Sequence, residues 1–131
     1  MPNIFYKNKS IFYFCNLVLV IFYLYPGSIF GYFLYSNIKI QPQLTSDFII
    51  SSNHFYVFCS ISIIGFLTYR KSEQIKFLII YLILLSIFLE IFHMFIPHRS
   101  FEYSDLFGNL AGSLVVIVLN YFIRNYAKYK N

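Results

Sequence analysis

The sequence carries very little charge for its size. Of its 131 residues only 11% are charged, whereas 59% are hydrophobic and 23% are aromatic. A soluble domain has roughly a quarter of its residues charged, so this composition excludes an ordinary soluble domain. Little chain remains once the apolar runs are removed. We therefore expect one integral membrane domain that covers residues 1–131.

Cysteine is scarce as well. Cys15 and Cys59 both lie inside apolar runs, and neither has a C-x-x-C partner. Small thiols in such surroundings usually pack like other apolar side chains. We expect both cysteines to be chemically inert.

Acidic residues are fewer than basic ones, five against ten, which gives a net charge of +5. Such an excess occurs in nucleic-acid-binding proteins. Here, however, the basic residues form short clusters beside apolar runs, which is how membrane topology is encoded. We therefore expect membrane lipids as partners and no nucleic acid.

Four apolar runs reach the roughly 20 residues that are needed to cross a bilayer. They cover about residues 11–33, 48–69, 75–96 and 104–123. The first is too long for a signal peptide and lacks a cleavage site. Pro26 and Gly27 predict a kink near its far end. The fold expected is an all-α membrane protein, a four-transmembrane-helix up-down bundle.

The distribution of Lys and Arg predicts the orientation of this bundle. Eight of them lie on one side of the predicted membrane: Lys7, Lys9, Arg70, Lys71, Lys76, Arg124, Lys128 and Lys130. The other side has only Lys39 and Arg99. Positive residues stay inside, so both termini should be cytoplasmic, and loops 35–47 and 97–103 should face outward.

Two G-x-x-x-G patterns mark places where helices approach closely. They are Gly27 with Gly31 in the first run, and Gly108 with Gly112 in the fourth. One interpretation is that the first and fourth helices cross there. The alternatives are that one pattern forms a homodimer, or that the spacing arises by chance.

Most of the acidic residues fall in one stretch, residues 89–113, which contains Glu90, Glu102 and Asp105 with Arg99 between them. Glu90 lies roughly 9 Å below the outer end of its predicted helix, at 1.5 Å per residue. His54 lies at a similar depth in the second helix. Asp105 and Asn109 are four apart and share a face of the fourth helix. We therefore expect these side chains to converge near the outer membrane boundary.

A charge inside a membrane usually marks a functional site. Arg99 is the natural partner for Glu90, because its planar fork grips a carboxylate at two points. Asp105 is a second candidate partner. Donors left over on Arg99 are suited to a phosphate or carboxylate from outside. The alternative is that Glu90 and Arg99 only clamp the hairpin between the third and fourth helices.

The histidines also have ordinary interpretations. His54 follows Ser52 and Asn53, where a hydrogen-bonded packing role is expected of a single histidine. His93 is three residues after Glu90, a spacing that metal ligands use, but diiron bundles need two such motifs and further carboxylates. We therefore expect no metal and no cofactor. We expect His98 at headgroup level and Glu102 to be solvated.

This arrangement resembles the VanZ-like family of small bacterial membrane proteins. The family pattern is a glutamate followed three later by glutamine, then Pro-x-Arg, an aspartate and Asn-x-x-Gly. Here these elements read Glu90, His93, Pro97-His98-Arg99, Asp105 and Asn109-Leu110-Ala111-Gly112. A His-Phe pair that starts an earlier helix is matched by His54 and Phe55. The likeness covers nearly the whole chain.

The sequence also departs from that pattern. Ile50 and Ser51 stand where the family often has Asp-Lys, and Val116 replaces a second small residue. The family is named for a member linked to low-level resistance to glycopeptides of the teicoplanin type, a role that we do not transfer to this chain. The resemblance implies a multi-pass protein of the bacterial inner (cytoplasmic) membrane that acts at the cell envelope.

The first functional hypothesis is a non-enzymatic module that binds an anionic envelope component, such as a lipid-linked precursor headgroup. Its site residues are His54, Glu90, His93, Arg99, Asp105 and Asn109. The second is an enzyme that acts on a lipid-linked substrate, with Glu90 or Asp105 as general base and His54 or His93 as acid. The third is a structural subunit that associates with itself or a membrane partner through the G-x-x-x-G faces.

Overall fold

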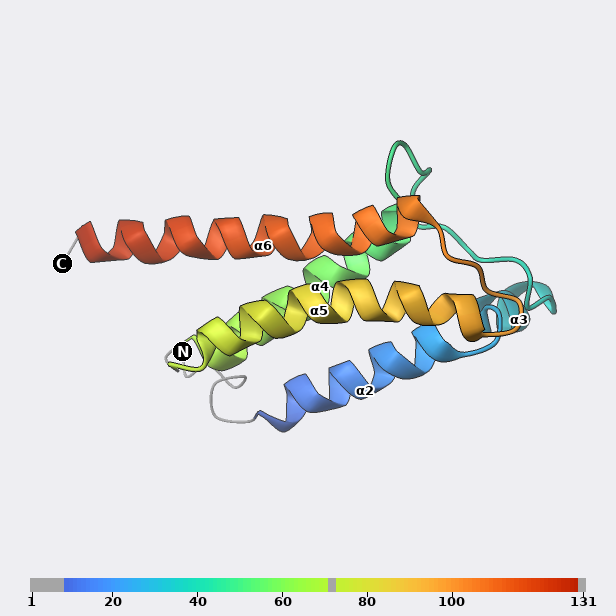
Figure 1. Cartoon of the computed structure of the whole chain (residues 1–131), viewed down its shortest axis with the longest axis horizontal. Coiled ribbons are helices and arrows are strands. Elements are labelled where there is room, and N and C mark those ends of the chain that lie inside the picture. Colours follow the sequence, from blue (N-terminus) through green and yellow to red (C-terminus); the bar gives the residue numbers. More distant parts are fainter. Residues whose placement is uncertain (1–8, 71–72, 130–131) are drawn as a thin grey trace.

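The chain is all-helical in the part that the structure describes. A computed structural model describes residues 9–70 and 73–129, except for the side chain of Lys128. Its five α-helices are α2 (Ser10–Leu24), α3 (Ile29–Tyr35), α4 (Ser52–Tyr69), α5 (Ile75–Phe92) and α6 (Tyr103–Tyr129), with a 3-10 turn η1 (His93–Phe95) after α5. Helices α2, α4, α5 and α6 run alongside one another, and α3 lies across one end (Figure 1).

Among the described residues, two stretches are long and apolar enough to cross a membrane as single helices, Ile75–Phe95 and Tyr103–Ala127. They correspond to the third and fourth predicted runs, and α6 continues six residues beyond the predicted end at 123. Helices α2 and α3 qualify only when taken together as one broken span. The structure therefore supports two or three candidate membrane spans, and the four-span bundle stays a prediction.

The first predicted run, 11–33, is broken rather than kinked. Its two helices meet at an angle of 72°. Tyr25 is extended because a residue before proline is pushed out of the helical region, and Gly27 adopts a φ of 94° that only glycine takes easily. Ser28 then starts α3, and its side chain accepts a hydrogen bond from Gly31 N.

Helix α4 is shorter and more polar than the second predicted run, 48–69. It begins at Ser52, so Phe48 and Ile49 belong to the preceding loop, where they are 93% and 75% exposed. The helix is packed among the others and buries polar residues together with Phe58, Ile61 and Phe66. Its polar residues explain why α4 alone does not qualify as a membrane span.

The glycine pairs do not join the first and fourth predicted helices, so that interpretation is wrong. A methyl carbon added at Gly108 would lie 2.7 Å from Ser51 O at the start of α4, and one added at Gly112 would lie 3.0 Å from Cys59 N within α4. Gly108 and Gly112 thus allow α6 to lie directly against α4.

Gly27 and Gly31 pack against the chain that follows α3, not against another helix. Their added methyl groups would meet backbone atoms of Asn37, Ile38 and Ile40. The absence of side chains at this pair therefore allows residues 37–40 of the following loop to pack against α3 and the turn before it.

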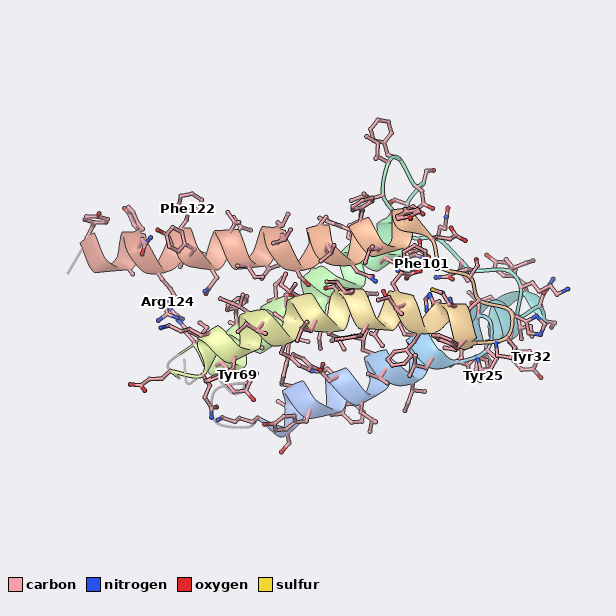
Figure 2. The ribbon with its side chains drawn as sticks, viewed as in Figure 1. Tyr25, Tyr32, Tyr69, Phe101, Phe122 and Arg124 are labelled. Carbon is pink, nitrogen blue, oxygen red and sulfur yellow. The ribbon has the colours of Figure 1, made fainter. Side chains whose placement is uncertain are left out.

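Most basic residues in the described part of the chain lie at the end away from α3, the exceptions being Lys39 and Arg99. Tyr69 and Arg124 lie at that end, whereas Tyr25, Tyr32 and Phe101 lie at the opposite end (Figure 2). Lys9 approaches this first end too, because its ammonium is 5.0 Å from the centre of the Tyr69 ring. Lys7, Lys71 and Lys130, and the side chain of Lys128, lie outside what is described, so the predicted orientation stays a prediction.

Candidate functional site

Four helix ends lie at the same end of the molecule as α3 (Figure 1). The C-terminal ends of α2 and α5 and the N-terminal ends of α4 and α6 all lie there. Ser51 N donates a hydrogen bond to Ser104 O at 3.0 Å, which ties the start of α4 to the start of α6. Polar residues that are distant in sequence are thereby brought together, as expected from the alternating direction of the helices.

Glu90, on α5, is completely buried at this end. Its Oε1 accepts a hydrogen bond from Glu102 N at 3.0 Å, next to the N-terminus of α6, where the helix dipole favours an anion. Its Oε2 is 3.3 Å from His93 Nδ1, yet makes no hydrogen bond within the described residues. A buried carboxylate oxygen without a partner is rare in folded proteins.

His93 is held in one orientation by the end of α2. Its Nε2 is 3.0 Å from Tyr23 O, and its ring stacks on the Tyr23 ring at 5.7 Å. A carbonyl oxygen only accepts hydrogen bonds, so Nε2 carries the hydrogen. The Nδ1 atom of His93 therefore points toward Glu90 without a hydrogen when the ring is neutral.

His54, on α4, is fixed by an analogous arrangement. Asn109 Nδ2 donates to Ser86 O at 3.2 Å, so Asn109 Oδ1 is left as an acceptor. That oxygen accepts from Tyr23 Oη at 2.8 Å and lies 3.0 Å from His54 Nδ1. Nδ1 must therefore be the donor, and it also lies 3.2 Å from Tyr23 Oη. The other ring nitrogen, Nε2, is 3.4 Å from Asp105 Oδ2.

Buried hydroxyl groups continue the polar cluster into the bundle. Ser86 Oγ donates to Leu82 O at 2.8 Å and lies 3.1 Å from Ser113 Oγ. Ser62 Oγ donates to Ser113 Oγ at 3.4 Å. These three serines are fully buried, and they link α4, α5 and α6 below Asn109.

Arg99 does not pair with Glu90, which corrects the predicted ion pair. Among the described residues, the basic side chains that lie within 4.0 Å of a carboxylate oxygen are histidines, and Arg99 is not one of them. Its Nη2 donates to Phe22 O at 3.3 Å, its Nε to Tyr25 O at 3.4 Å, and its Nη1 to Gln41 Oε1 at 3.2 Å.

The break at Pro26 explains this choice of partners. The last carbonyl groups of a helix lack partners within the helix, and the negative end of the helix dipole attracts a cation. Burial lowers the pKa of Arg99 from its ordinary value, and the nearby Tyr23, Asp105 and Glu90 act the other way. A guanidinium is not deprotonated in proteins, so Arg99 is cationic at neutral pH.

A cavity of about 420 Å³ opens beside these residues. Its walls come from α2, α3, α4 and the loop between α3 and α4, and it is lined by both polar and apolar side chains. Arg99, His54 and His93 contribute to the polar part, while Phe30 and Val57 contribute to the apolar part. The cavity thus suits a molecule with an anionic group and an apolar portion.

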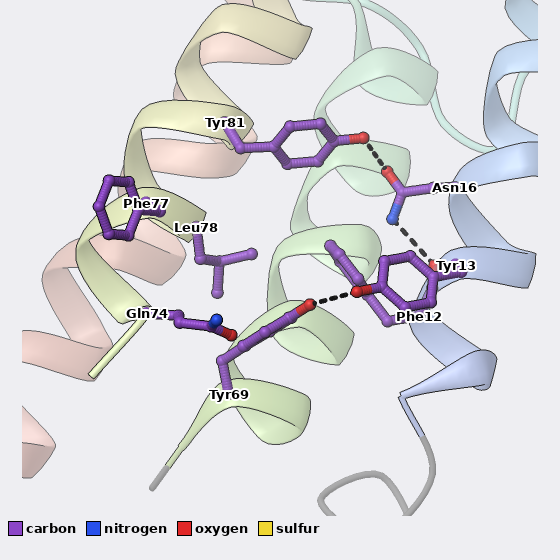
Figure 3. Close-up of a pocket in the computed structure, with 8 residues that line it drawn as sticks. All are labelled: Phe12, Tyr13, Asn16, Tyr69, Gln74, Phe77, Leu78 and Tyr81. Carbon is purple, nitrogen blue, oxygen red and sulfur yellow. Dashed lines mark hydrogen bonds between the residues drawn. The ribbon is translucent and has the colours of Figure 1, made fainter. Parts of the chain in front are cut away.

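A second cavity, of about 490 Å³, lies at the other end of the bundle (Figure 3). Tyr81 Oη donates to Asn16 Oδ1 at 2.6 Å, and the hydroxyl groups of Tyr13 and Tyr69 are 3.1 Å apart. Its polar groups bond to one another across α2, α4 and α5. It contains none of the predicted site residues, so we do not include it in the site.

The structure brings His54, Glu90, His93, Asp105 and Asn109 into one cluster and places Arg99 at its edge, on the carbonyl groups of α2. Their roles in ligand binding stay predictions. Glu102 is exposed, as expected, and its side chain accepts from Ser100 Oγ.

Sequence reasoning missed Tyr23, which contacts both histidines and Asn109. A single tyrosine in an aromatic-rich run gave no signal. The one available signal was its position close to Pro26, where helix α2 ends beside the polar cluster.

No protein-family model matches the chain, and no curated protein or solved structure matches it either.

Proposed function

We propose that the chain is a small multi-pass membrane protein that binds the anionic headgroup of a cell-envelope amphiphile. The headgroup occupies the cavity beside α3, and the four helices α2, α4, α5 and α6 cross the membrane with both termini in the cytoplasm. This agrees with the resemblance to the VanZ-like family, whose members act at the bacterial envelope. The charge bias of the loops supports the orientation.

The observation that carries the proposal is the state of Arg99. Its guanidinium lines the cavity and has no carboxylate partner among the described residues. An arginine side chain has five N–H donors, and three of them are used by Phe22 O, Tyr25 O and Gln41 Oε1. One donor on each terminal nitrogen remains, which suits a phosphate or carboxylate oxygen.

The first prediction tests this anion site. In lipid nanodiscs, binding of a polyprenyl phosphate should weaken by at least about tenfold in Arg99→Gln, or ~1.4 kcal/mol, because a charge-assisted hydrogen bond is lost. Lys39→Gln removes the other basic residue of the same predicted side and should bind as the wild type does. The affinity of each variant is measured by titration with polyprenyl phosphate, monitored by native mass spectrometry.

A thermal unfolding curve for each variant separates binding from folding. Arg99→Lys keeps the charge without the planar fork and should bind with intermediate affinity. Equal affinity in all variants would contradict the proposal, and loss of folding in Arg99→Gln and Arg99→Lys alike would show instead that Arg99 serves to stabilise the fold through the carbonyl groups of α2.

A second candidate function is catalysis on the same amphiphile. The observation in its favour is that the imidazole of His54 lies against Asp105 and that of His93 against Glu90, so that acid–base groups line or adjoin the cavity. Turnover of a polyprenyl-phosphate substrate that disappears in Glu90→Gln would establish it. Intact substrate after prolonged incubation would leave binding as the function.

A further inference from the structure

We propose that His54, Glu90 and Asp105 bind a divalent transition-metal ion. One ligand atom from each of these residues lies within 4.8 Å of the other two. In a tetrahedral zinc site, bonds of 2.0–2.2 Å put neighbouring ligand atoms about 3.4 Å apart. Closing the remaining distance takes side-chain rotation rather than movement of helices. This inference does not depend on anion binding by Arg99.

The hydrogen bonds around His54 leave the correct nitrogen free. Its Nδ1 is committed as a donor to Asn109 Oδ1, so the neutral ring presents a lone pair at Nε2 to Asp105 Oδ2, 3.4 Å away. Two acceptors that face each other need a proton or a cation between them. A histidine that donates its other N–H to a fixed oxygen is the usual support of a metal ligand.

Glu90 supplies an independent indication. Its Oε1 is satisfied by Glu102 N, whereas its buried Oε2 has no hydrogen bond within the described residues. A carboxylate oxygen of Glu90 lies within 4.8 Å of a ring nitrogen of His54 and of a carboxylate oxygen of Asp105. A metal ion would satisfy an oxygen that makes no hydrogen bond within the described residues, although it faces His93 Nδ1, in a place without exposure to water.

His93 adds a further lone pair beside the three ligands. Its Nε2 donates to Tyr23 O, which leaves Nδ1 3.3 Å from Glu90 Oε2. The cluster therefore offers two carboxylates and two neutral imidazoles. Their formal charge of −2 is balanced by a divalent ion.

The mixture of nitrogen and oxygen ligands defines the class of metal. Imidazole favours Zn²⁺, Fe²⁺ or Ni²⁺ over Mg²⁺ and Ca²⁺, which prefer oxygen ligands. Zn²⁺ is the probe of choice because it accepts four ligands of this kind and has no redox chemistry. The alternative is that protons alone are shared between each histidine and its carboxylate.

The second prediction separates these alternatives with the full chain, purified in nanodiscs through a tag without histidine. The protein is incubated with Zn²⁺ and the excess is removed. The bound metal is then measured by inductively coupled plasma mass spectrometry. We expect about one ion per chain in the wild type and in His98→Gln, a matched control in the exposed loop. We expect none in His54→Gln or Glu90→Gln.

The unfolding temperature, measured with and without Zn²⁺, distinguishes loss of metal binding from loss of folding. In Glu90→Gln and Asp105→Asn, the new amide N–H₂ can donate to the facing histidine nitrogen, so both variants should fold without metal. Zn²⁺ should raise the unfolding temperature of the wild type and of His98→Gln only. Fe²⁺ or Mn²⁺ retained in equal amount from the cell would also support the site. A wild type that neither retains a divalent metal nor responds to Zn²⁺, or a Glu90→Gln variant that still binds it, overturns the proposal.

Discussion

At the scale of single residues, Tyr23 organises the polar cluster although it carries no charge. Its hydroxyl group donates to Asn109 Oδ1 and lies 3.2 Å from His54 Nδ1, and its backbone oxygen accepts from His93. Both histidines are therefore oriented by one residue at the end of α2. Any function that needs their free nitrogens depends on this tyrosine.

The third prediction concerns that hydroxyl group. Tyr23→Phe leaves Asn109 Oδ1 and His54 Nδ1 with one buried partner fewer, so we expect the free energy of unfolding to fall by about 1 kcal/mol. Tyr32→Phe, at an exposed ring of α3, is the control and should change it little. Denaturant titration in detergent measures both. An unchanged Tyr23→Phe would show that the hydrogen bonds do not stabilise the fold.

Of the residues in the candidate site, the charged ones and the histidines could be predicted from the sequence. Glu90, Asp105 and His54 stood out because charged or titratable residues are costly inside apolar runs. Ser86 and Ser113 did not, because serine is common in membrane helices and pairs across them without a sequence signal. The main partners of Arg99 were missed because two of the three are backbone carbonyl groups, freed by a helix break whose angle the sequence did not specify.

At the scale of elements, the contact between α4 and α6 depends on the absence of side chains. Gly108 and Gly112 let the backbone of α6 approach Ser51, Phe55 and Cys59. The Cys59 thiol, expected to be inert, donates weakly to Gly112 O at 3.4 Å. This close approach places Asp105 and Asn109 against His54.

The fourth prediction tests that contact. In Gly112→Ala the new methyl group meets the backbone of α4, which cannot move aside, so stability should fall by about 1–3 kcal/mol. In Gly65→Ala the methyl group meets only the ends of the Leu78 and Phe12 side chains, at 3.0 Å each, and the loss should be smaller. Unfolding by sodium dodecyl sulfate measures both. Equal losses would contradict the role given to the α4–α6 approach.

The element boundaries show why some of the fold was predictable. The runs 75–96 and 104–123 matched helices because they are continuous and apolar. Helix α6 continues past Ile123 since Arg124, Asn125 and Tyr126 do not stop a helix. The start of α4 was misplaced because Phe48 and Ile49 extend the apolar run into a loop that Asp47 and Asn53 hold by hydrogen bonds.

At the scale of the whole molecule, the polar cluster and most of the described basic residues lie at opposite ends of the helices. Figure 2 shows Arg124 and Tyr69 at one end of the molecule and Tyr25, whose carbonyl oxygen accepts from Arg99, at the other. This separation agrees with the predicted orientation, in which the cluster faces outward. It gives the proposal a test that does not involve any ligand.

The fifth prediction uses single cysteines at Lys39, Glu73 and Arg124, introduced after Cys15 and Cys59 are replaced by alanine. A membrane-impermeant maleimide should label Lys39→Cys in intact cells, and Glu73→Cys and Arg124→Cys only after lysis. Labelling of Lys39→Cys and Glu73→Cys from the same side would show that α4 does not cross the membrane. Labelling of Arg124→Cys in intact cells would show that the C-terminus faces outward, so the predicted orientation would be wrong.

The polar character of α4 also bears on how the protein reaches its membrane. A segment that carries serine, asparagine and histidine partitions poorly from the translocon into lipid by itself. The groups that satisfy Ser62 and His54 include residues of α6, which is synthesised last. If α4 crosses the membrane as proposed, its stable integration should therefore wait for the C-terminal helix.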